Sequence, residues 1–114
     1  MGAPAAGAVV LVRFPFSDLS QTKVRPAVVL ADAGRGDCIL CQITSKPYGD
    51  ASAIELNDTA FVAGSLRVIS YARPAKLFTA HQNLITSQVG QLQADALRSI
   101  AQAVANIVTA GTLP

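Results

Sequence analysis

The spacing of the hydrophobic positions changes once along this chain, near residue 90. Before that point the apolar residues form short blocks, and the runs at 8–12 and 27–30 have the continuous form of buried strands. After it, apolar positions recur every three to four residues, which predicts a helix with one apolar face that ends near Gly111. The positions on that face are Leu92, Leu97, Ile100, Ala101, Val104, Ile107 and Val108.

Further strands are expected between these two regions at 38–44, 53–56 and 66–71, with loops rich in Gly, Pro, Asp, Asn and Ser around them. Residues 76–79 either continue the strand at 66–71 or form another strand beyond Pro74. The sequence "DAGRGD" contains two glycines and predicts a turn that closes a hairpin onto the strand at 38–44.

Together these elements predict one small domain. Short strands followed by a single helix are typical of a small barrel with a helix packed on it, so we expect a mainly β fold with a C-terminal helix. The domain is expected to span 1–114, with residues 1–7 as a loose leader. Four aspartates lie beside turn-forming residues and are expected to cap turns, namely Asp32, Asp37, Asp50 and Asp58.

The composition adds an expectation about partners. The chain is 51% hydrophobic and only 14% charged, well below the usual quarter, so we expect an apolar subunit interface. The net charge of +2 permits an anionic partner. The first residues lack the positive start of a signal peptide, and no apolar run has the length of a membrane span. We therefore expect a cytoplasmic protein that does not contact the membrane.

The cysteine and histidine residues give no sign of a metal site. Cys38 and Cys41 are three residues apart on a predicted strand, so they should point to opposite faces as small buried side chains. No second pair of Cys or His residues completes a zinc site, and we expect neither a metal nor a cofactor. The only histidine, His81, has polar neighbours and is expected at the surface.

A group of polar residues flanks two of the strands. Lys23 and Arg25 precede one strand, and the next strand closes with Gln42, Thr44, Ser45 and Lys46. Counting back from the hairpin turn brings Arg25 and Thr44 to the same end of the sheet. An arginine beside a hydroxyl on rigid strands is suited to binding an anion. The residues alone also allow Arg25 to pair with Asp18, with Thr44 merely filling a strand position.

Three stretches carry a resemblance to a known family. "VVLVRFPFSDLSQTKVRPAVVL", "CILCQITS" and "SYARPAKLFT" occur in the order found in the MazF/PemK toxins, and the likeness extends over roughly residues 7–92. These toxins are small homodimeric endoribonucleases of type II toxin–antitoxin systems. The resemblance implies an SH3-like barrel (MazF/CcdB-like), a homodimer, an RNA substrate and a cognate acidic antitoxin.

The resemblance also implies roles for individual residues. The family's catalytic arginine stands in an R-P-A motif that matches Arg25, and its catalytic threonine stands in an I-T-S motif that matches Thr44. Family members cut single-stranded RNA without a metal, leaving a 2′,3′-cyclic phosphate and a 5′-hydroxyl. Pro26 restricts the backbone of Arg25 to extended conformations. The residues expected to bind RNA are Lys23, Gln42, Ser45, Lys46, Arg73 and Lys76.

Some positions depart from the family pattern. Ala8 stands where an aspartate is usual, Gln21 where a glycine is often found, and Ala75 and His81 where acidic residues are common. These departures bear on substrate preference and activity more than on the fold. Two alternatives stay open, a catalytically silent module that only binds an antitoxin and a gyrase-directed toxin like CcdB. The latter family relies on a tryptophan near its C-terminus, and this chain has no tryptophan.

Overall fold

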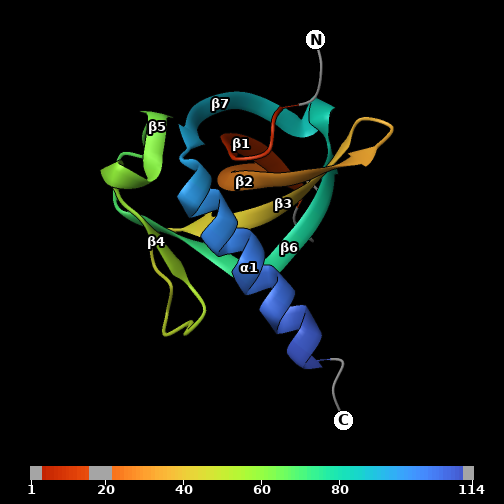
Figure 1. Cartoon of the computed structure of the whole chain (residues 1–114). Coiled ribbons are helices and arrows are strands. Elements are labelled where there is room, and N and C mark those ends of the chain that lie inside the picture. Colours follow the sequence, from red (N-terminus) through yellow and green to blue (C-terminus); the bar gives the residue numbers. More distant parts are fainter. Residues whose placement is uncertain (1–3, 16–21, 112–114) are drawn as a thin grey trace.

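A computed structural model describes residues 4–15 and 22–111, and Figure 1 shows a curled antiparallel sheet crossed by one helix. The strand order in the sheet is β4-β6-β3-β2-β1-β7-β5. The strands are β1 (Ala8–Pro15), β2 (Thr22–Gly34), β3 (Asp37–Thr44), β4 (Ile54–Leu56), β5 (Phe61–Gly64), β6 (Ser70–His81) and β7 (Ile85–Leu92). The helices are α1 (Ala94–Gly111) and the short 3-10 helices η1 (Asp58–Ala60) and η2 (Gln82–Leu84). The expected mainly β fold with a C-terminal helix is confirmed.

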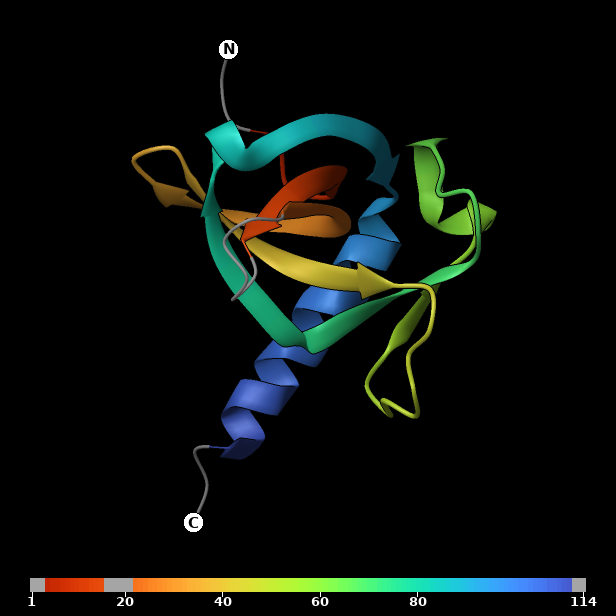
Figure 2. The same ribbon diagram turned by 180° about the vertical axis from the view of Figure 1, so that it is seen from behind.

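Buried side chains form two clusters because the central strands are apolar on both faces. One cluster lies beneath α1 and joins Ile100 of the helix to residues such as Val28 and Cys41. The other contains Val29 and Leu40, which are the sequence neighbours of Val28 and Cys41 and point to the opposite face. Seen from behind in Figure 2, the sheet is curled, with β7 passing above and β6 passing below the central strands β1, β2 and β3.

The hairpin predicted from "DAGRGD" is present. β2 pairs with β3 in antiparallel orientation, and Gly34 lies opposite Asp37 at the turn. Asp32 caps this turn as expected. Its carboxylate accepts a hydrogen bond from the backbone N–H of Gly34 at 2.8 Å. β2 is longer than the apolar run predicted, because its polar ends also pair with neighbouring strands.

The second half of the sheet differs from the sequence expectation. Of the two alternatives for residues 76–79, the structure shows the continued strand, because they lie in β6, but residues 66–69 precede β6 as a loop. Pro74 does not break β6, because it lies where the ladder with β3 shifts register and no backbone N–H is needed. The strands β5 and β7 were not predicted, because β7 ("ITSQVGQL") is mostly polar and half exposed.

Gly7, at the end of the expected loose leader over residues 1–7, is bonded to the sheet. The Gly7 N–H donates to the carbonyl of Val29 at 2.8 Å, and the Leu92 N–H donates to the carbonyl of Gly7 at 2.9 Å. Gly7 has a φ of +91°, and an added Cβ would lie 2.7 Å from the side-chain nitrogen of Gln91. Residues 1–3 lie outside the described part.

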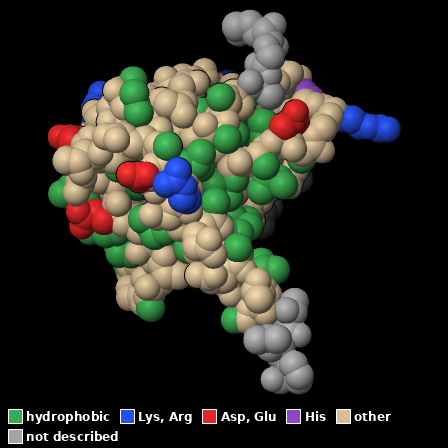
Figure 3. Space-filling model, viewed as in Figure 1, with side chains coloured by type: hydrophobic (Ala, Val, Ile, Leu, Met, Phe, Trp, Pro, Cys, Tyr) green, Lys and Arg blue, Asp and Glu red, His purple; other side chains and the backbone are tan. Residues whose placement is uncertain are grey.

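The helix packs on the sheet only along its first half. Ile100 is fully buried, whereas Ile107 and Val108, which the pattern placed on the same apolar face, are 37% and 58% exposed. Figure 1 shows the C-terminal half of α1 extending past the edge of the sheet. Figure 3 shows hydrophobic side chains gathered on this same side of the molecule, with few charged groups among them. Within the described ranges, no helix is long and apolar enough to cross a membrane.

Candidate active site

The sheet register brings the two expected catalytic residues to one row. The last pair between β2 and β3 joins Ala27 to Gln42, so Arg25 and Thr44 each lie two residues beyond it, at the same end of the sheet. Side chains alternate along a strand, which places Arg25 and Thr44 on the same face as Ala27 and Gln42. Ala27 belongs to the core cluster on the face opposite α1. Arg25 and Thr44 therefore lie at the edge of this core cluster, where the paired part of β2 and β3 ends.

Three of the residues expected to bind RNA share this face. Lys23 precedes Arg25 by two positions and is exposed, and Gln42 lies between Thr44 and the core. Lys76 is two residues from Phe78, which packs on the same core cluster, so alternation places Lys76 on this face as well. The face thus combines two lysines, Arg25 and a hydroxyl within a few strand positions.

Thr44 is tethered to the residues that follow it. Its hydroxyl oxygen accepts a hydrogen bond from the Lys46 N–H at 3.1 Å and donates to the Lys46 carbonyl at 3.2 Å. A hydroxyl has one proton to donate, so Thr44 can donate to an anion only by releasing that carbonyl. Ser45 and Lys46 are both exposed at this point, where β3 ends and the next loop begins.

Arg73 has a different environment from the one expected of an RNA-binding residue. Its Nε donates to the carboxylate of Asp50 at 2.8 Å, and the two side chains are only 24% and 12% exposed. Asp50 also accepts hydrogen bonds from the Ser52 N–H and hydroxyl. The hydrogen bond from Arg73, followed by those from Ser52, lowers the pKa of Asp50 to about 2. Arg73 is therefore part of a fixed ion pair between β6 and the loop before β4.

The opposite face at the same strand ends holds an apolar cavity of about 440 Å³. Pro26 and Ser45, which directly follow Arg25 and Thr44 in the sequence, line it together with residues of the loop before β6. The other lining residues are Leu11, Ser65, Leu66, Arg67, Val68, Ser70 and Val89. The polar row and the apolar cavity therefore lie on opposite faces at the same end of the sheet.

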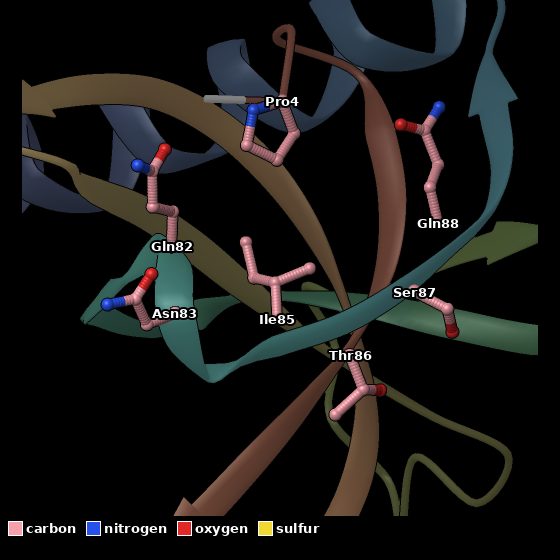
Figure 4. A pocket seen from close by; sticks show the side chains of 7 residues that line it. All are labelled: Pro4, Gln82, Asn83, Ile85, Thr86, Ser87 and Gln88. Atoms are coloured by element: carbon pink, nitrogen blue, oxygen red, sulfur yellow. The ribbon is translucent and has the colours of Figure 1, made fainter. Parts of the chain in front are cut away.

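A second hollow, of about 340 Å³, lies beside η2 and β7 (Figure 4). In Figure 4 the side chains of Pro4 and Ile85 point toward one another across it, and the amides of Gln82 and Gln88 lie at its rim. Amides, hydroxyls and apolar groups line it, without an ionisable side chain. It includes none of the residues that the sequence pointed to, and its lining offers no group for acid–base chemistry.

Sequence reasoning missed two residues that the register adds to the row. Tyr71 in β6 lies directly opposite Thr44, and Glu55 in β4 lies directly opposite Tyr71. Directly opposite residues point to the same face, so the row runs from Glu55 through Tyr71 and Thr44 to Arg25. The sequence offered no means of finding them, because the pairing of β6 with β3 spans a long stretch of chain.

The cysteines and the histidine have structural environments. Cys38 and Cys41 are both buried and belong to the two different core clusters, as expected from their spacing. Burial raises the pKa of the Cys41 thiol to about 11, and its S–H donates to the Arg73 carbonyl at 3.2 Å. His81 accepts a hydrogen bond from the Asn83 N–H at 3.1 Å and so caps η2. Among the described residues, no group of three or more His, Cys, Asp and Glu side chains is arranged to hold a metal.

Comparison with known protein families identifies the chain. A family model described as PemK-like, MazF-like toxin of type II toxin–antitoxin system matches residues 5–108. The chain belongs to this toxin family. The match covers all four strands that carry the row, Arg25 and Thr44 included. No curated protein sequence matches the chain.

Solved structures with the MazF fold resemble this toxin over nearly its whole length. A MazE–MazF complex from Deinococcus radiodurans superimposes with a TM-score of 0.76 at 21% identity, covering 96% of this chain and 98% of that one. An endoribonuclease from a mycobacterial species gives 0.70 at 16% identity, with 96% and 94% covered. An endoribonuclease in complex with its cognate antitoxin, also mycobacterial, gives 0.66 at 17% identity, with 100% and 98% covered. At these identities the likeness establishes the fold of the MazF-like toxin.

Proposed function

We propose that this MazF-like toxin is a metal-independent endoribonuclease that cuts single-stranded RNA in the cytoplasm. The observation that carries the proposal is the row of Arg25 and Thr44 on one face of the sheet, with Lys23 and Lys76 on the same face. The family match adds support, because proteins similar in fold include two endoribonucleases. Cationic groups around a phosphate site are what a polyanionic substrate requires.

In the proposed reaction the ribose 2′-hydroxyl attacks the adjacent phosphorus, and the bond from phosphorus to the 5′-oxygen of the next nucleotide breaks. The products are a 2′,3′-cyclic phosphate and a 5′-hydroxyl. The guanidinium of Arg25 donates two parallel hydrogen bonds to the phosphate oxygens and disperses the charge that builds up on them. Thr44 donates to a further oxygen after releasing the Lys46 carbonyl.

The two protons in this reaction need an acceptor and a donor. The 2′-hydroxyl loses one as it attacks, and the leaving 5′-oxygen gains one. A guanidinium has hydrogen-bond donors and no acceptor, so Arg25 cannot be the base, and we assign it to charge stabilisation and to hydrogen-bond donation to the reacting oxygens. We assign no residue to the role of base. Lys23, Gln42, Ser45, Lys46 and Lys76 are proposed to hold the flanking RNA, whereas Arg73 is proposed to position the loop through Asp50.

The proposal is tested by product analysis. Purified protein is incubated with single-stranded RNA in excess chelator, and the new ends are mapped. We expect cleavage to persist and the products to carry 5′-hydroxyl and 2′,3′-cyclic phosphate ends. Cleavage that chelator abolishes, or products with 5′-phosphates, would contradict it. A protein that binds antitoxin but leaves every RNA intact would instead fit the silent-module alternative.

We further propose an acidic antitoxin and a second copy of the chain as partners. One similar structure is an endoribonuclease in complex with its cognate antitoxin, and another is a MazE–MazF complex. The exposed large apolar residues Val24, Val68 and Ile69, at 50%, 59% and 55% exposure, offer the surface that an apolar interface between copies needs. Sedimentation at micromolar concentration should give twice the chain mass of 11.8 kDa. A monomer at that concentration would overturn the homodimer.

A further inference from the structure

The chain holds two tyrosines and no tryptophan, and both tyrosines lie at the Thr44 end of β3. Tyr71 is directly opposite Thr44 on the neighbouring strand. Tyr48 follows Thr44 by four residues, a length of chain that reaches at most about 14 Å. We propose that Tyr48 and Tyr71 are stacking platforms for unpaired bases next to the phosphate bound at Arg25 and Thr44. This inference rests on the proposed function, because it assumes that RNA crosses the row.

The backbone presents Tyr48 in a conformation that a bulky residue rarely adopts. Its φ is +52° and that of Gly49 is +76°, and the Asp50 N–H donates to the Pro47 carbonyl at 3.0 Å. Two central residues with positive φ define a type I′ turn, whose first central position normally holds Asn, Asp or Gly. The turn holds the Tyr48 side chain 83% exposed. Backbone strain of this kind tends to occur at functional sites, and here it presents an aromatic ring to solvent.

Bonds at both ends of the loop anchor the backbone segment that carries Tyr48. At the near end, the Thr44 hydroxyl makes both of its hydrogen bonds to the Lys46 backbone. At the far end, Asp50 forms its ion pair with Arg73. Asp50 and Arg73 each lie two residues after one of the tyrosines, so this ion pair ties together the two segments that carry the rings. A loop backbone anchored in this way loses less conformational entropy when a ligand binds than a loose one would.

The chemistry of this arrangement favours single strands. Every unpaired base exposes a flat face that can stack on an aromatic ring, whereas the bases of a duplex are already stacked on one another. Lys46 lies two residues before Tyr48 and is exposed, so a cation is available beside the ring for the backbone phosphate. Rings that alternate with cations are the usual means by which proteins hold single-stranded nucleic acid.

The absence of tryptophan makes the inference directly measurable, because the two tyrosines account for the protein's emission above 300 nm. The probe is a single-stranded oligomer of 2′-O-methyl RNA, which cannot be cut by 2′-hydroxyl attack, and the control probe is an abasic oligomer of equal charge. Each is titrated into the wild type and into Tyr48→Phe, Tyr48→Leu, Tyr71→Phe and Tyr71→Leu. Arg35→Ala is the matched control, because it removes an exposed cation at the opposite end of β3.

We expect the RNA oligomer to quench tyrosine emission and the abasic oligomer to bind weakly without quenching. Phenylalanine variants should keep their affinity, because the ring remains. Leucine variants should bind about 5- to 150-fold more weakly, the range for losing one stacked base. Arg35→Ala should leave the affinity nearly unchanged. Melting temperature checks that Tyr71→Leu, in a strand, still folds, and Tyr48→Leu tests the inference independently on the exposed loop.

The outcomes separate this inference from the proposed function. The proposal that Tyr48 and Tyr71 stack on bases would be refuted if the leucine variants bound as tightly as the wild type. It would also be refuted if the abasic oligomer bound as tightly as RNA. A wild type that binds no RNA would overturn it too. Stacking without cleavage of unmodified RNA would support the platforms and refute the endoribonuclease. Cleavage that is unaffected by both leucine substitutions would refute the platforms alone.

Discussion

At its start β3 meets the hairpin turn, and at its end it meets the loop that carries Tyr48. Both ends have a non-glycine residue with positive φ, Arg35 at +56° and Tyr48 at +52°. At the hairpin end, Arg35 is flanked by two glycines, and the polar side chains are engaged in local bonds to the backbone, as for Asp32. Polar residues there close a turn.

The other end of β3 has a different composition. Lys23, Arg25 and Lys46 are all exposed at this end of the strand, and Asp50 of the following loop forms its ion pair with Arg73. Exposed cations beside a hydroxyl suit an anionic ligand. The comparison teaches that turn residues and site residues look alike in the sequence, and that their positions in the sheet register distinguish them.

The largest expected effect is at Arg25. Arg25→Lys keeps the charge but loses the planar pair of donors, so turnover should fall by roughly 10²-fold, about 2.7 kcal/mol in barrier. The melting temperature should stay close to that of the wild type, because Arg25 is exposed at a strand end. Rates with single-stranded RNA and thermal unfolding are measured together. Near-normal turnover, or a loss explained by unfolding, would remove Arg25 from the proposed site.

A smaller effect is expected at Thr44. Thr44→Ala should lower turnover by roughly tenfold, about 1.4 kcal/mol, because one donor to the phosphate is lost. Thr44→Ser keeps the hydroxyl and should retain most of the activity. Removing the hydroxyl also deletes the tether to Lys46, so unfolding by urea is followed in both variants. Equal turnover in the alanine and serine variants would show that the hydroxyl has no part in the chemistry.

The ion pair between Asp50 and Arg73 predicts a pH dependence of stability. The pKa of Asp50 is about 2 in the folded protein, below its ordinary value near 4, so the folded state binds this proton more weakly than the unfolded state. Its stabilising contribution is therefore complete above about pH 4 and is lost as the pH falls toward 2. The difference in unfolding free energy between the wild type and Asp50→Asn should shrink over that window. A difference that stays constant from pH 7 to pH 2 would contradict the assignment.

The smallest effect is expected at the hairpin end of β3. Asp32→Ala removes the hydrogen bond to the Gly34 N–H and should cost about 0.5–1 kcal/mol of stability. Turnover should not change, since Asp32 lies at the far end of the strand from Arg25. If Asp32→Ala clearly lost activity at a temperature where the variant is fully folded, the two ends of β3 would not be independent.

Local patterns predicted the elements that depend on local residues. The apolar runs predicted β1, β2 and β3, and the two glycines predicted the hairpin between β2 and β3. The helical period of the apolar residues predicted α1. β7 was missed because its polar residues gain their strand conformation from pairing with β1. The same limit applies to the site, where Arg25 and Thr44 could be reached through one hairpin. Tyr71 and the partner of Arg73 depend on pairings between distant parts of the chain.

The central claim is that Arg25 and Thr44 act on the same phosphate, and a double-mutant cycle tests it most directly. Single-turnover cleavage is measured for the wild type, Arg25→Lys, Thr44→Ala and the double variant, with melting temperatures for all four. Residues that share one transition state lose less together than the product of their separate losses. We predict that the double variant cleaves RNA at about the same rate as Arg25→Lys alone. Losses that multiply in full would show that the two residues act independently and would contradict the account.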